Sequence, residues 1–525
     1  MKNSETRIAH SDKNERYTKD KDRDIENTTR LMEAYDGSFF DGIVKINRKA
    51  KPGPIVFLVS DGESNIDAVT KDSEFEVDDV VHIMGPVTDR VGRRQIEISR
   101  IEKSNANFDE IIEKISIPKR TNFSIDSSRY NIMKDRFIII AQRIRKAILD
   151  NEPIIIRHHN DADGISSGIA LEIACSNMMK TIGINPEYNL YRSPSRAPFY
   201  EVTDVFRDIS LSKRITENHG QKKPLIIVAD NGSTPEDSFA LKMLKLLGYN
   251  AIVIDHHNPV ILTKLGGHKK TGHEGQIFES SVCQYLEYHL NPYLFGLDSQ
   301  TSAGMLCHEM ARFVDETYEN KLMPAVAAVA DRCNIAESDS YIANSGVSFE
   351  ELTRIGVAID FMAYHMKFDI STPIVKELFA KKDFVELINE EVRVGVETQL
   401  QSTLPYLRTL DINGITLSYI DLEKYTLRFT YPSAGKVIGL IHDKISLGKE
   451  NPVISLGCVS DMIIVRATKP ILPVQKIIDT IKAKLPEANA DGGGHECAGT
   501  IKFVPAHMDA VLQIIKDELH KIEVE

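Results

Sequence analysis

Three short apolar runs in the middle of the chain each stop abruptly at acidic or histidine residues. The runs are residues 153–156 (PIII), 225–228 (LIIV) and 251–254 (AIVI). Continuous apolar runs of this length are typical of strands that are buried on both faces of a parallel sheet. In open α/β sheets, ligands bind just beyond the carboxyl ends of such strands. We therefore expect the residues that follow the three runs to form one site.

Helix signals separate these runs. Gly164 opens a stretch with apolar residues at helical spacing, and residues 233–236 (STPE) combine a hydroxyl cap with a proline in the first turn. Gly248 stands where the following helix should end before the next strand. This alternation of strand and helix predicts a doubly wound α/β domain around a parallel sheet.

The N-terminal part of the chain has a different pattern. Short alternating runs at 40–46, 55–59, 80–84 and 95–98 are separated by turn signals such as Asp61-Gly62. Several short strands in about 65 residues predict a small all-β barrel of the OB type, although another compact β module would give the same pattern.

Together these patterns predict a smaller C-terminal α/β domain after the parallel-sheet domain, and the following organisation. The segments are a charged, disordered tail (1–32), an OB-like nucleic-acid-binding domain (33–105), a basic helical connector (106–150), a catalytic α/β domain (151–365), a helical linker (366–408) and a substrate-binding α/β domain (409–525).

Composition narrows the class of protein. The net charge of −12 is unusual for a nucleic-acid binder, because phosphate contacts come from clustered Lys and Arg. Residues 119–146, however, hold eight basic residues against two acidic ones. The six cysteines form no C-x-x-C pair, which argues against a zinc finger and favours a cytoplasmic protein with reduced thiols. The sequence has neither an apolar run of about 20 residues nor a secretory signal, so we expect no membrane partner.

Candidate metal ligands follow the three apolar runs. Asp161 and Asp163 are two residues apart, so in an extended chain both carboxylates leave the same face and repel each other unless a cation lies between them. A D-x-D pair by itself is more often a solvated turn. Here His159 precedes the pair, and Asp230 and the triplet 255–257 (DHH) occupy equivalent strand ends. This constellation predicts a metal site.

The ligand types limit the metal. Carboxylate and imidazole without thiolate favour Mn²⁺ or Mg²⁺ over structural zinc. There are enough ligands for two ions, and a two-metal site suits phosphoryl hydrolysis with a metal-bound water as the nucleophile. The chain has no G-x-x-x-x-G-K-[ST] loop, so we expect no phosphate binding of the Walker type.

A glycine run near the C-terminus, residues 492–495 (GGGH), is a second candidate site. Three glycines allow a phosphate to approach the backbone closely and to meet a nest of N–H donors. Such a run by itself is more often a turn.

These residues resemble the motifs of the DHH phosphoesterase superfamily, and most closely those of its archaeal RecJ-like nucleases, over about 150–525. The stretches 159–164 (HNDADG), 230–232 (DNG), 255–257 (DHH) and 328–331 (AVAD) stand in the order of the family's motifs. The run 492–495 is similar to the signature of the C-terminal DHH-associated domain.

The resemblance implies roles for individual residues. One ion would be held by His159, Asp161 and Asp230. The second would be held by Asp163, Asp230, His256 and Asp331, with Asp230 bridging the two ions. These ligands and His257 form the implied catalytic set, and the implied substrate contacts are His257, Arg466, Gly492, Gly493, Gly494 and His495.

The sequence therefore predicts a two-metal phosphodiesterase that acts as an exonuclease on single-stranded DNA or RNA in replication or repair. Two alternatives stay open: a phosphodiesterase for oligonucleotides or cyclic dinucleotides, and a non-catalytic replisome scaffold. A replisome partner such as a GINS-like complex is implied by the resemblance alone.

The barrel offers candidate contacts to the strand. Arg90, Arg93 and Arg94 lie on a predicted β-hairpin where they could track a phosphodiester backbone. The phenylalanines at positions 39, 40 and 57 could stack bases, but burial in the barrel core is the more common place for this residue type.

Overall fold

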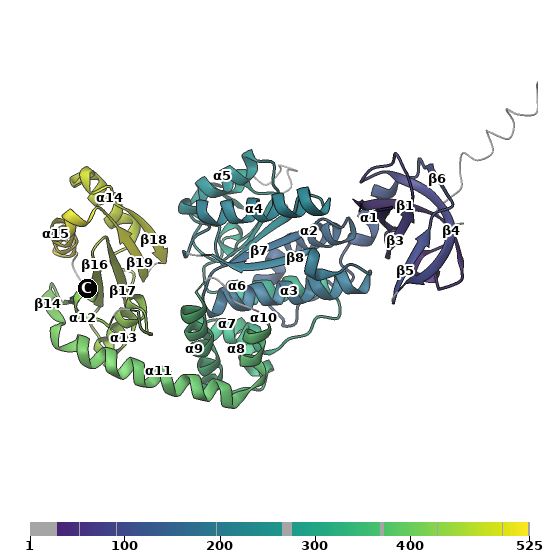
Figure 1. Cartoon of the computed structure of the whole chain (residues 1–525). Coiled ribbons are helices and arrows are strands. Elements are labelled where there is room, and N and C mark those ends of the chain that lie inside the picture. The colour runs from purple at the N-terminus through teal and green to yellow at the C-terminus, as the bar shows by residue number, and fades with distance from the viewer. Residues whose placement is uncertain are drawn as a thin grey trace, which may run out of the picture.

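The structure is a computed structural model, and it describes residues 29–522 except 52, 91, 196, 265–275, 368–371, 428 and 496. Most of the predicted tail thus lies outside the described residues. Figure 1 shows a barrel, a central lobe built on a parallel sheet and a C-terminal lobe in a row, with helix α11 (Lys382–Thr403) running beneath the central and C-terminal lobes.

The N-terminal body is a closed five-stranded barrel, as the short alternating runs predict. The strands pair in the order β1-β2-β3-β5-β4, and β4 pairs back to β1 and closes the ring. Strands β3 and β5 are parallel, and β6 extends the sheet beyond β4. The strands are β1 (Phe39–Ala50), β2 (Ile55–Ser60), β3 (Asn65–Thr70), β4 (Val80–Arg90), β5 (Arg93–Glu97) and β6 (Arg100–Lys103), and the short 3₁₀ helix Leu31–Glu33 precedes them.

Two of the three phenylalanines considered as base-stacking residues form the barrel core. Phe40 and Phe57 are 1% and 0% exposed, so their rings are closed to a ligand. Phe39 has the opposite orientation at the start of β1 and is 60% exposed. The alternation of a strand's two faces separates the adjacent residues 39 and 40 in this way.

The basic segment between the barrel and the central lobe forms α1 (Phe108–Ser116) and α2 (Ser128–Leu149). Most of its basic side chains are buried or form ion pairs within the protein. Arg136 is fully buried, and Arg143 forms ion pairs with Glu152 at 2.8 Å and Glu287 at 2.9 Å. The cluster of basic residues in the sequence therefore supports the packing of α2 rather than an open basic surface.

The central lobe is a doubly wound parallel sheet, as predicted. Its strands lie in the order β13-β10-β9-β7-β8, and each neighbouring pair is parallel. Helices α4 and α5 pack on one face with their own apolar core, and α2, α3, α6 and α7 pack on the other. The elements are β7 (Ile154–His158), α3 (Ala162–Thr181), β8 (Leu190–Pro194), α4 (Val202–His219), β9 (Leu225–Ala229), α5 (Ser238–Leu246), β10 (Ala251–Ile254), β13 (Tyr288–Leu290), α6 (Ala303–Val314) and α7 (Leu322–Ala330), with the small hairpin β11 (Ile261–Lys264) and β12 (Phe278–Ser280).

Helices connect the central lobe to the C-terminal one. Residues 366–408, predicted as a helical linker, contain α10 and α11, while 368–371 lie outside the described residues. The helices are α8 (Ala336–Ser345), α9 (Phe349–Met366), α10 (Thr372–Ala380) and α11.

The C-terminal lobe has a mixed sheet in the order β14-β15-β16-β17-β19-β18, in which only the β15–β16 pair is parallel among the described strands. Helices α14 and α15 pack on one face, and α12 and α13 pack on the other. The elements are β14 (Arg408–Ile412), β15 (Ile415–Asp421), α12 (Leu422–Tyr425), α13 (Ala434–Ser446), β16 (Val453–Val459), β17 (Met462–Ala467), α14 (Val474–Lys484), β18 (Asp491–His495), β19 (Ala498–Lys502) and α15 (Met508–Leu519). Among the described residues, no helix combines the length and the apolar character needed to cross a membrane.

Candidate metal centre and the cleft between the lobes

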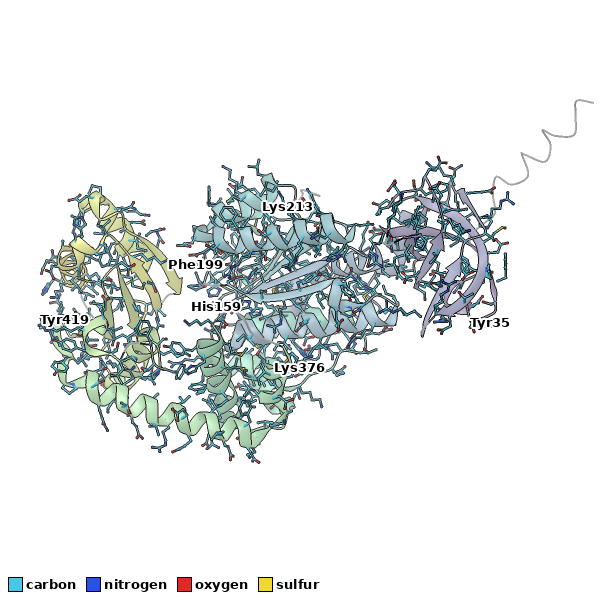
Figure 2. All side chains as sticks on the ribbon, in the orientation of Figure 1. Tyr35, His159, Phe199, Lys213, Lys376 and Tyr419 are labelled. Carbon is cyan, nitrogen blue, oxygen red and sulfur yellow. The ribbon has the colours of Figure 1, made fainter. Side chains whose placement is uncertain are left out.

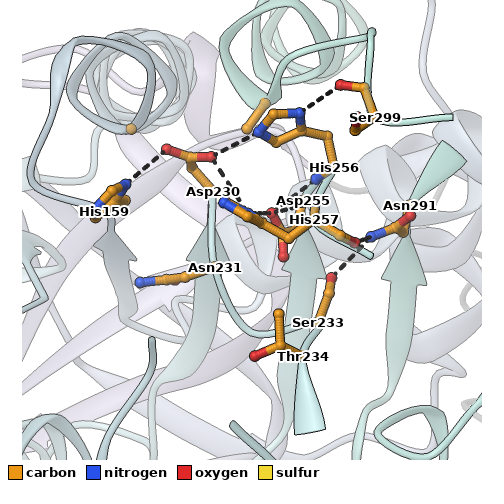
Figure 3. A network of polar contacts seen from close by, with 12 residues as sticks. His159, Asp230, Asn231, Ser233, Thr234, Asp255, His256, His257, Asn291 and Ser299 are labelled. Atoms are coloured by element: carbon orange, nitrogen blue, oxygen red, sulfur yellow. Dashed lines mark hydrogen bonds and ion pairs between the residues drawn. The ribbon is translucent and has the colours of Figure 1, made fainter. Parts of the chain in front are cut away.

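The candidate metal ligands meet at one edge of the parallel sheet. His159 follows β7, Asp230 follows β9, and His256 follows β10, and Figure 3 shows these three side chains turned toward one another. Parallel strands end at the same edge, so residues about 70 and 100 positions apart in sequence become neighbours. Asp331 joins them from the end of α7, where it is the C-cap residue.

The first group of ligand atoms consists of His159, Asp161 and Asp230. His159 Nδ1 lies 3.0 Å from Asp161 Oδ2 and 3.5 Å from Asp230 Oδ2. All three ligand atoms lie within 4.8 Å of one another. A compact set of one imidazole and two carboxylates matches the donors that Mn²⁺ and Mg²⁺ accept.

The second group lies on the other side of Asp230. His256 Nε2 is 3.4 Å from Asp230 Oδ1 and 3.8 Å from Asp163 Oδ2, and Asp331 Oδ2 is 3.6 Å from the other ring nitrogen of His256. The two oxygens of Asp230 therefore face the two groups separately. This is the geometry that a bridging carboxylate requires.

Backbone hydrogen bonds fix the tautomer of His256. Its Nδ1 lies 2.7 Å from the carbonyl oxygen of Ser299, which can only accept a hydrogen bond, so Nδ1 carries the proton. The lone pair of Nε2 then points toward Asp163 and Asp230. A ligating histidine commonly has its second nitrogen held in this way.

The two carboxylates of the D-x-D pair are held by helix starts. Asp161 caps α3 and accepts a hydrogen bond from the Gly164 amide at 2.9 Å. Asp163 accepts hydrogen bonds from the amides of Ala303 and Gly304 at 2.9 and 2.8 Å, at the start of α6. Gly304 has no room for a side chain, because a Cβ there would lie 2.7 Å from Asp163 Oδ1.

Asp255 and His257 form a supporting pair behind Asp230. His257 Nδ1 lies 2.7 Å from Asp255 Oδ1 and 3.9 Å from Asp230 Oδ1. The amide of Asn291 donates hydrogen bonds to the carbonyl of His257 at 2.8 Å and to the hydroxyl of Ser233 at 3.0 Å. Figure 3 shows this network beneath the ligand groups.

The electrostatics of the cluster favour a cation. Burial, together with repulsion from Asp230 and Asp331, raises the pKa of Asp163 well above its usual value. Burial also raises the pKa of Asp331 to about 6, although His256 opposes this effect. In His159, burial lowers the pKa, but Asp161 and Asp230 outweigh it and raise the pKa well above the usual value. The carboxylates of Asp163 and Asp331 are thus destabilised by burial and by neighbouring carboxylates, and divalent ions on this donor set would balance their charge.

His158, which duplicates the histidine of the first motif, does not belong to the cluster. It is fully buried, and its Nε2 lies 2.7 Å from Arg192 Nη1. Burial and the neighbouring Arg192 lower its pKa well below the usual value. Gly168 on α3 leaves the space that the ring occupies.

The C-terminal lobe contacts the central lobe beside the metal cluster. Lys436 at the start of α13 forms an ion pair with Asp360 of α9, and Asp360 in turn accepts a hydrogen bond from the Ala162 amide at 3.0 Å. A second ion pair joins Arg332, next to Asp331, to Asp443 at 2.9 Å. These contacts tie the C-terminal lobe to the segments that carry the candidate ligands.

A cavity of about 650 Å³ opens between the two lobes next to the first ligand group. His159 and Asp161 line it from the central lobe, and Tyr431 and Lys436 line it from the C-terminal lobe. Tyr364 of α9 also lines it and packs against Tyr431 with ring centroids 5.6 Å apart.

Apart from His257, the predicted substrate contacts lie on the C-terminal lobe. Arg466 is in β17, where burial and then Arg332 lower its pKa. The glycine run forms β18, an edge strand paired with β19, in place of the turn or nest considered from the sequence. A Cβ on Gly493 would lie 2.9 Å from Glu236 Oε1 of the central lobe, so the strand faces the cleft. His495 ends β18, but its side chain lies outside the described residues.

Two residues of this site carry no signal in the sequence. Asp360 lies inside a helical stretch, and Lys436 lies outside the motifs described above. Their ion pair depends on how the two lobes pack, and no local pattern marks such a contact.

Comparison with known sequences places these motifs in a family. Residues 153–268 match the model of the DHH family, N-terminal domain. An uncharacterised protein of Methanocaldococcus jannaschii is 34% identical over 524 residues, which covers 89% of this chain and 67% of that protein. A second uncharacterised protein of the same organism is 27% identical over 176 residues and covers 33% of this chain and 32% of that protein.

Solved structures show the same likeness. The DHH domain of a member of the s1p family of ribosomal proteins is 33% identical, with a TM-score of 0.73, and covers 79% of this chain and 97% of that one. The exonuclease RecJ bound to manganese is 15% identical, with a TM-score of 0.48, and covers 74% of this chain and 95% of that one. On the family model, the relative that is 34% identical and the shared fold, this chain belongs to the DHH family.

Proposed function

We propose that this protein is a divalent-metal-dependent phosphodiesterase that removes nucleotides from single-stranded DNA or RNA. Membership of the DHH family supports a hydrolase of this type. The observation that carries the proposal is the position of Asp230, whose two carboxylate oxygens face separate groups of ligands. A single-ion or purely structural site would need no such carboxylate between two donor sets.

The motif roles suggest how the ligands would divide between two ions. His159 and Asp161 would hold one ion with Asp230, and the other would be held by Asp230 with Asp163, His256 and Asp331. When bound, the two ions supply positive charge to the scissile phosphate and lower the pKa of the attacking water. His257 stands within reach of the same centre, and its hydrogen bond to Asp255 fixes the ring orientation.

The cavity between the lobes suits the end of a strand. Its volume of about 650 Å³ lies in the range of small-molecule sites, and the partly exposed Tyr364 offers a ring against which a base can stack. Lys436 brings a positive charge to the same wall. Contacts between the lobes on both sides of the cleft, Lys436 with Asp360 and Lys502 with the ring of Phe199 at 5.7 Å, narrow the entrance against a duplex.

The second candidate function is a non-catalytic scaffold, which the filled ligand positions disfavour. A scaffold has no need to keep a buried set of mutually repelling carboxylates, because such a set costs stability without a cation. The two functions differ in a direct measurement of hydrolysis.

The test is digestion of end-labelled single-stranded DNA, single-stranded RNA and duplex DNA by the full chain with Mn²⁺, Mg²⁺ or EDTA. We expect product ladders from a single strand only and only with a metal. Asp230→Asn should reduce the rate by about a hundredfold or more, because it removes charge that both ions share. Asp339→Asn, which changes an exposed carboxylate on α8 of the same lobe, is the matched control.

Two results would overturn the proposal. If pure protein binds Mn²⁺ but yields no product from any of the three substrates, the scaffold function is supported instead. Asp230→Asn with a rate near that of Asp339→Asn would show that hydrolysis takes place elsewhere.

A further inference from the structure

A second polar crevice lies between the barrel and the central lobe, at the opposite end of α3 from the metal centre. The crevice measures about 590 Å³ and is lined by β1, β2 and β3, by the β4–β5 turn, and by the residues that follow α2 and α3. Helix α3 starts beside Asp161 and reaches the crevice at Thr181. Its 20 residues separate the two sites by about 30 Å.

The walls of the crevice are held together by direct bonds. The backbone amide and the side-chain amide of Asn65 both donate hydrogen bonds to the Ile182 carbonyl, at 2.9 and 3.0 Å. Lys45 of the barrel forms an ion pair with Asp150 at 3.0 Å. Gly183 passes so close to the barrel that a Cβ there would lie 2.8 Å from the Asn65 carbonyl oxygen. The crevice is thus a preformed feature of two docked bodies.

One lining residue has an unsatisfied amide. Asn151 is 2% exposed, and neither its Oδ1 nor its Nδ2 has a hydrogen-bond partner among the described residues. Its φ of 51° places it in the left-handed turn after α2, where asparagine is common. The turn explains the backbone conformation of Asn151 but not its unpaired side-chain amide, because buried polar groups nearly always have a hydrogen-bond partner. Arg48 Nε, also in the lining, is buried and has no hydrogen-bond partner in the described part of the chain.

The lining is positively charged although the chain carries a net charge of −12. Four cationic side chains line the crevice, and Asp67 is the one acidic side chain among its described lining residues. Asp67 lies 3.9 Å from Arg48, so it offsets part of that charge. The cationic residues are Arg48, Arg93, Arg94 and Lys180.

The barrel topology points to the same kind of ligand. In OB-type barrels, the face of strands 2 and 3 and the loop between strands 4 and 5 bind oligonucleotides and oligosaccharides. Here these elements form one wall of the crevice, and the central lobe provides the other. Tyr188 at the rim is 52% exposed, so its ring is open to a planar ligand.

We propose that this crevice is a nucleotide-binding site shared by the barrel and the central lobe. The arginines and Lys180 hold the phosphate, and the Asn151 amide, which is buried in the wall of the crevice, turns its donor and its acceptor toward the edge of the base. A free nucleotide and a nucleotide within a single strand have this chemistry in common. The proposal does not rest on the proposed hydrolysis, because none of the metal ligands lines the crevice.

The test is calorimetric titration of the full chain in EDTA, which prevents metal-dependent cleavage of the probes. The probes are the four nucleoside 5′-monophosphates, inorganic phosphate, and 12-nucleotide strands of deoxythymidine and uridine. Lys180→Glu reverses one lining charge, and Asn151→Gly removes the amide but keeps a residue that accepts positive φ. Lys376→Glu on α10 makes the same charge change at an exposed position far from the crevice and serves as the control (Figure 2).

We expect both crevice variants to weaken binding by about tenfold, the effect of one charge-assisted or base-edge hydrogen bond, while Lys376→Glu binds like the unaltered chain. Loss of monophosphate binding identifies a free nucleotide as the ligand, and loss of strand binding alone identifies a nucleotide within a strand. Equal binding of inorganic phosphate and monophosphates would overturn the proposal, as would binding of all probes that neither variant changes. Absence of any binding would also overturn it and would leave the crevice to water.

Discussion

The two faces of the cleft are built from sheets of opposite design. In the central lobe all neighbouring strands are parallel, so β7, β9 and β10 deliver their following residues to one edge. In the C-terminal lobe most pairs are antiparallel, so neighbouring strands end at opposite edges. The first design can assemble a crowded ligand cluster, and the second cannot.

The two faces also differ in charge. The central lobe contributes the carboxylates around Asp230, whereas the C-terminal lobe contributes Lys436 from a helix start and Arg466 from a strand. A face that gathers metal ligands should govern the chemical step, and a face that offers separate cations should govern substrate affinity. Substitutions on the central face should therefore mainly lower kcat, and substitutions on the C-terminal face should mainly raise KM.

Among changes to a ligand of a single predicted ion, the largest effect is expected from Asp163→Asn on the central face. This change removes a buried negative charge from the second ligand group, while the new side chain still fills the space. We expect turnover to fall by about a thousandfold, the upper range for removing one group that stabilises transition-state charge. Titration with Mn²⁺ should show one bound ion fewer. Retention of both ions would place Asp163 outside the ligand set.

Gly304→Ala should have the next largest effect, although Gly304 is not itself a ligand. The new methyl group would overlap the Ala327 Cβ on α7 and lie 2.7 Å from Asp163 Oδ1, so it would shift α6 against α7 and displace the carboxylate from the start of α6. We expect Mn²⁺ affinity and turnover to fall by about 10- to 100-fold, as for other residues that orient metal ligands. The matched control is Gly356→Ala on α9, where the nearest atom lies at an ordinary 3.5 Å. Equal behaviour of the two variants would contradict the role of the α6 amides.

On the opposite face, Lys436→Met should act mainly on substrate affinity. The ion pair with Asp360 overcomes burial and raises the pKa of Lys436, so the amine stays charged at the cleft wall. We expect KM to rise by about tenfold, with a smaller change in kcat, for loss of one charged contact. Steady-state kinetics should show no such rise for Lys444→Met, an exposed lysine on the same helix. A fall in kcat at constant KM would assign Lys436 to the chemistry instead.

The smallest effect is expected from Gly493→Ala in the edge strand. A Cβ there would meet Glu236 Oε1 at 2.9 Å, and the end of a flexible side chain can shift to make room. We expect kcat/KM to fall by roughly threefold, which is less than the effect of losing one hydrogen bond. Thermal stability should not change. Gly439→Ala, with open space around it, should have no effect. A loss as large as that of Gly304→Ala would mean that the glycine strand contacts the reacting phosphate.

The fold was largely predictable because its signals are local. Apolar runs that end in Asp or His mark strand ends, and this is why His159, Asp230 and His256 could be proposed as neighbours before their distances were known. The closed barrel was predictable for the same reason, since alternation and turn dipeptides lie within the strands that they define. The assignment of ions to these ligands remains a prediction.

Features that depend on packing between distant segments were not predictable. The basic residues of 119–146 have the composition of a nucleic-acid surface, but the fold turns Arg136 inward and pairs Arg143 with Glu152 and Glu287. The pair of Lys436 and Asp360 joins residues 76 positions apart, and nothing in either neighbourhood marks it. The glycine run could not be placed as an edge strand because its backbone is permissive in every conformation.

The length of α3 has a consequence for the size of a substrate. This helix separates the metal centre from the crevice at the barrel by about 30 Å, and a strand stacked as in B-form DNA advances about 3.4 Å per nucleotide. A strand that occupies both places must therefore be on the order of nine nucleotides long. The length of α3 would then set the shortest strand that reaches both sites. Shorter oligomers would contact only one of the two sites, so the rate of digestion should drop in a step below this length.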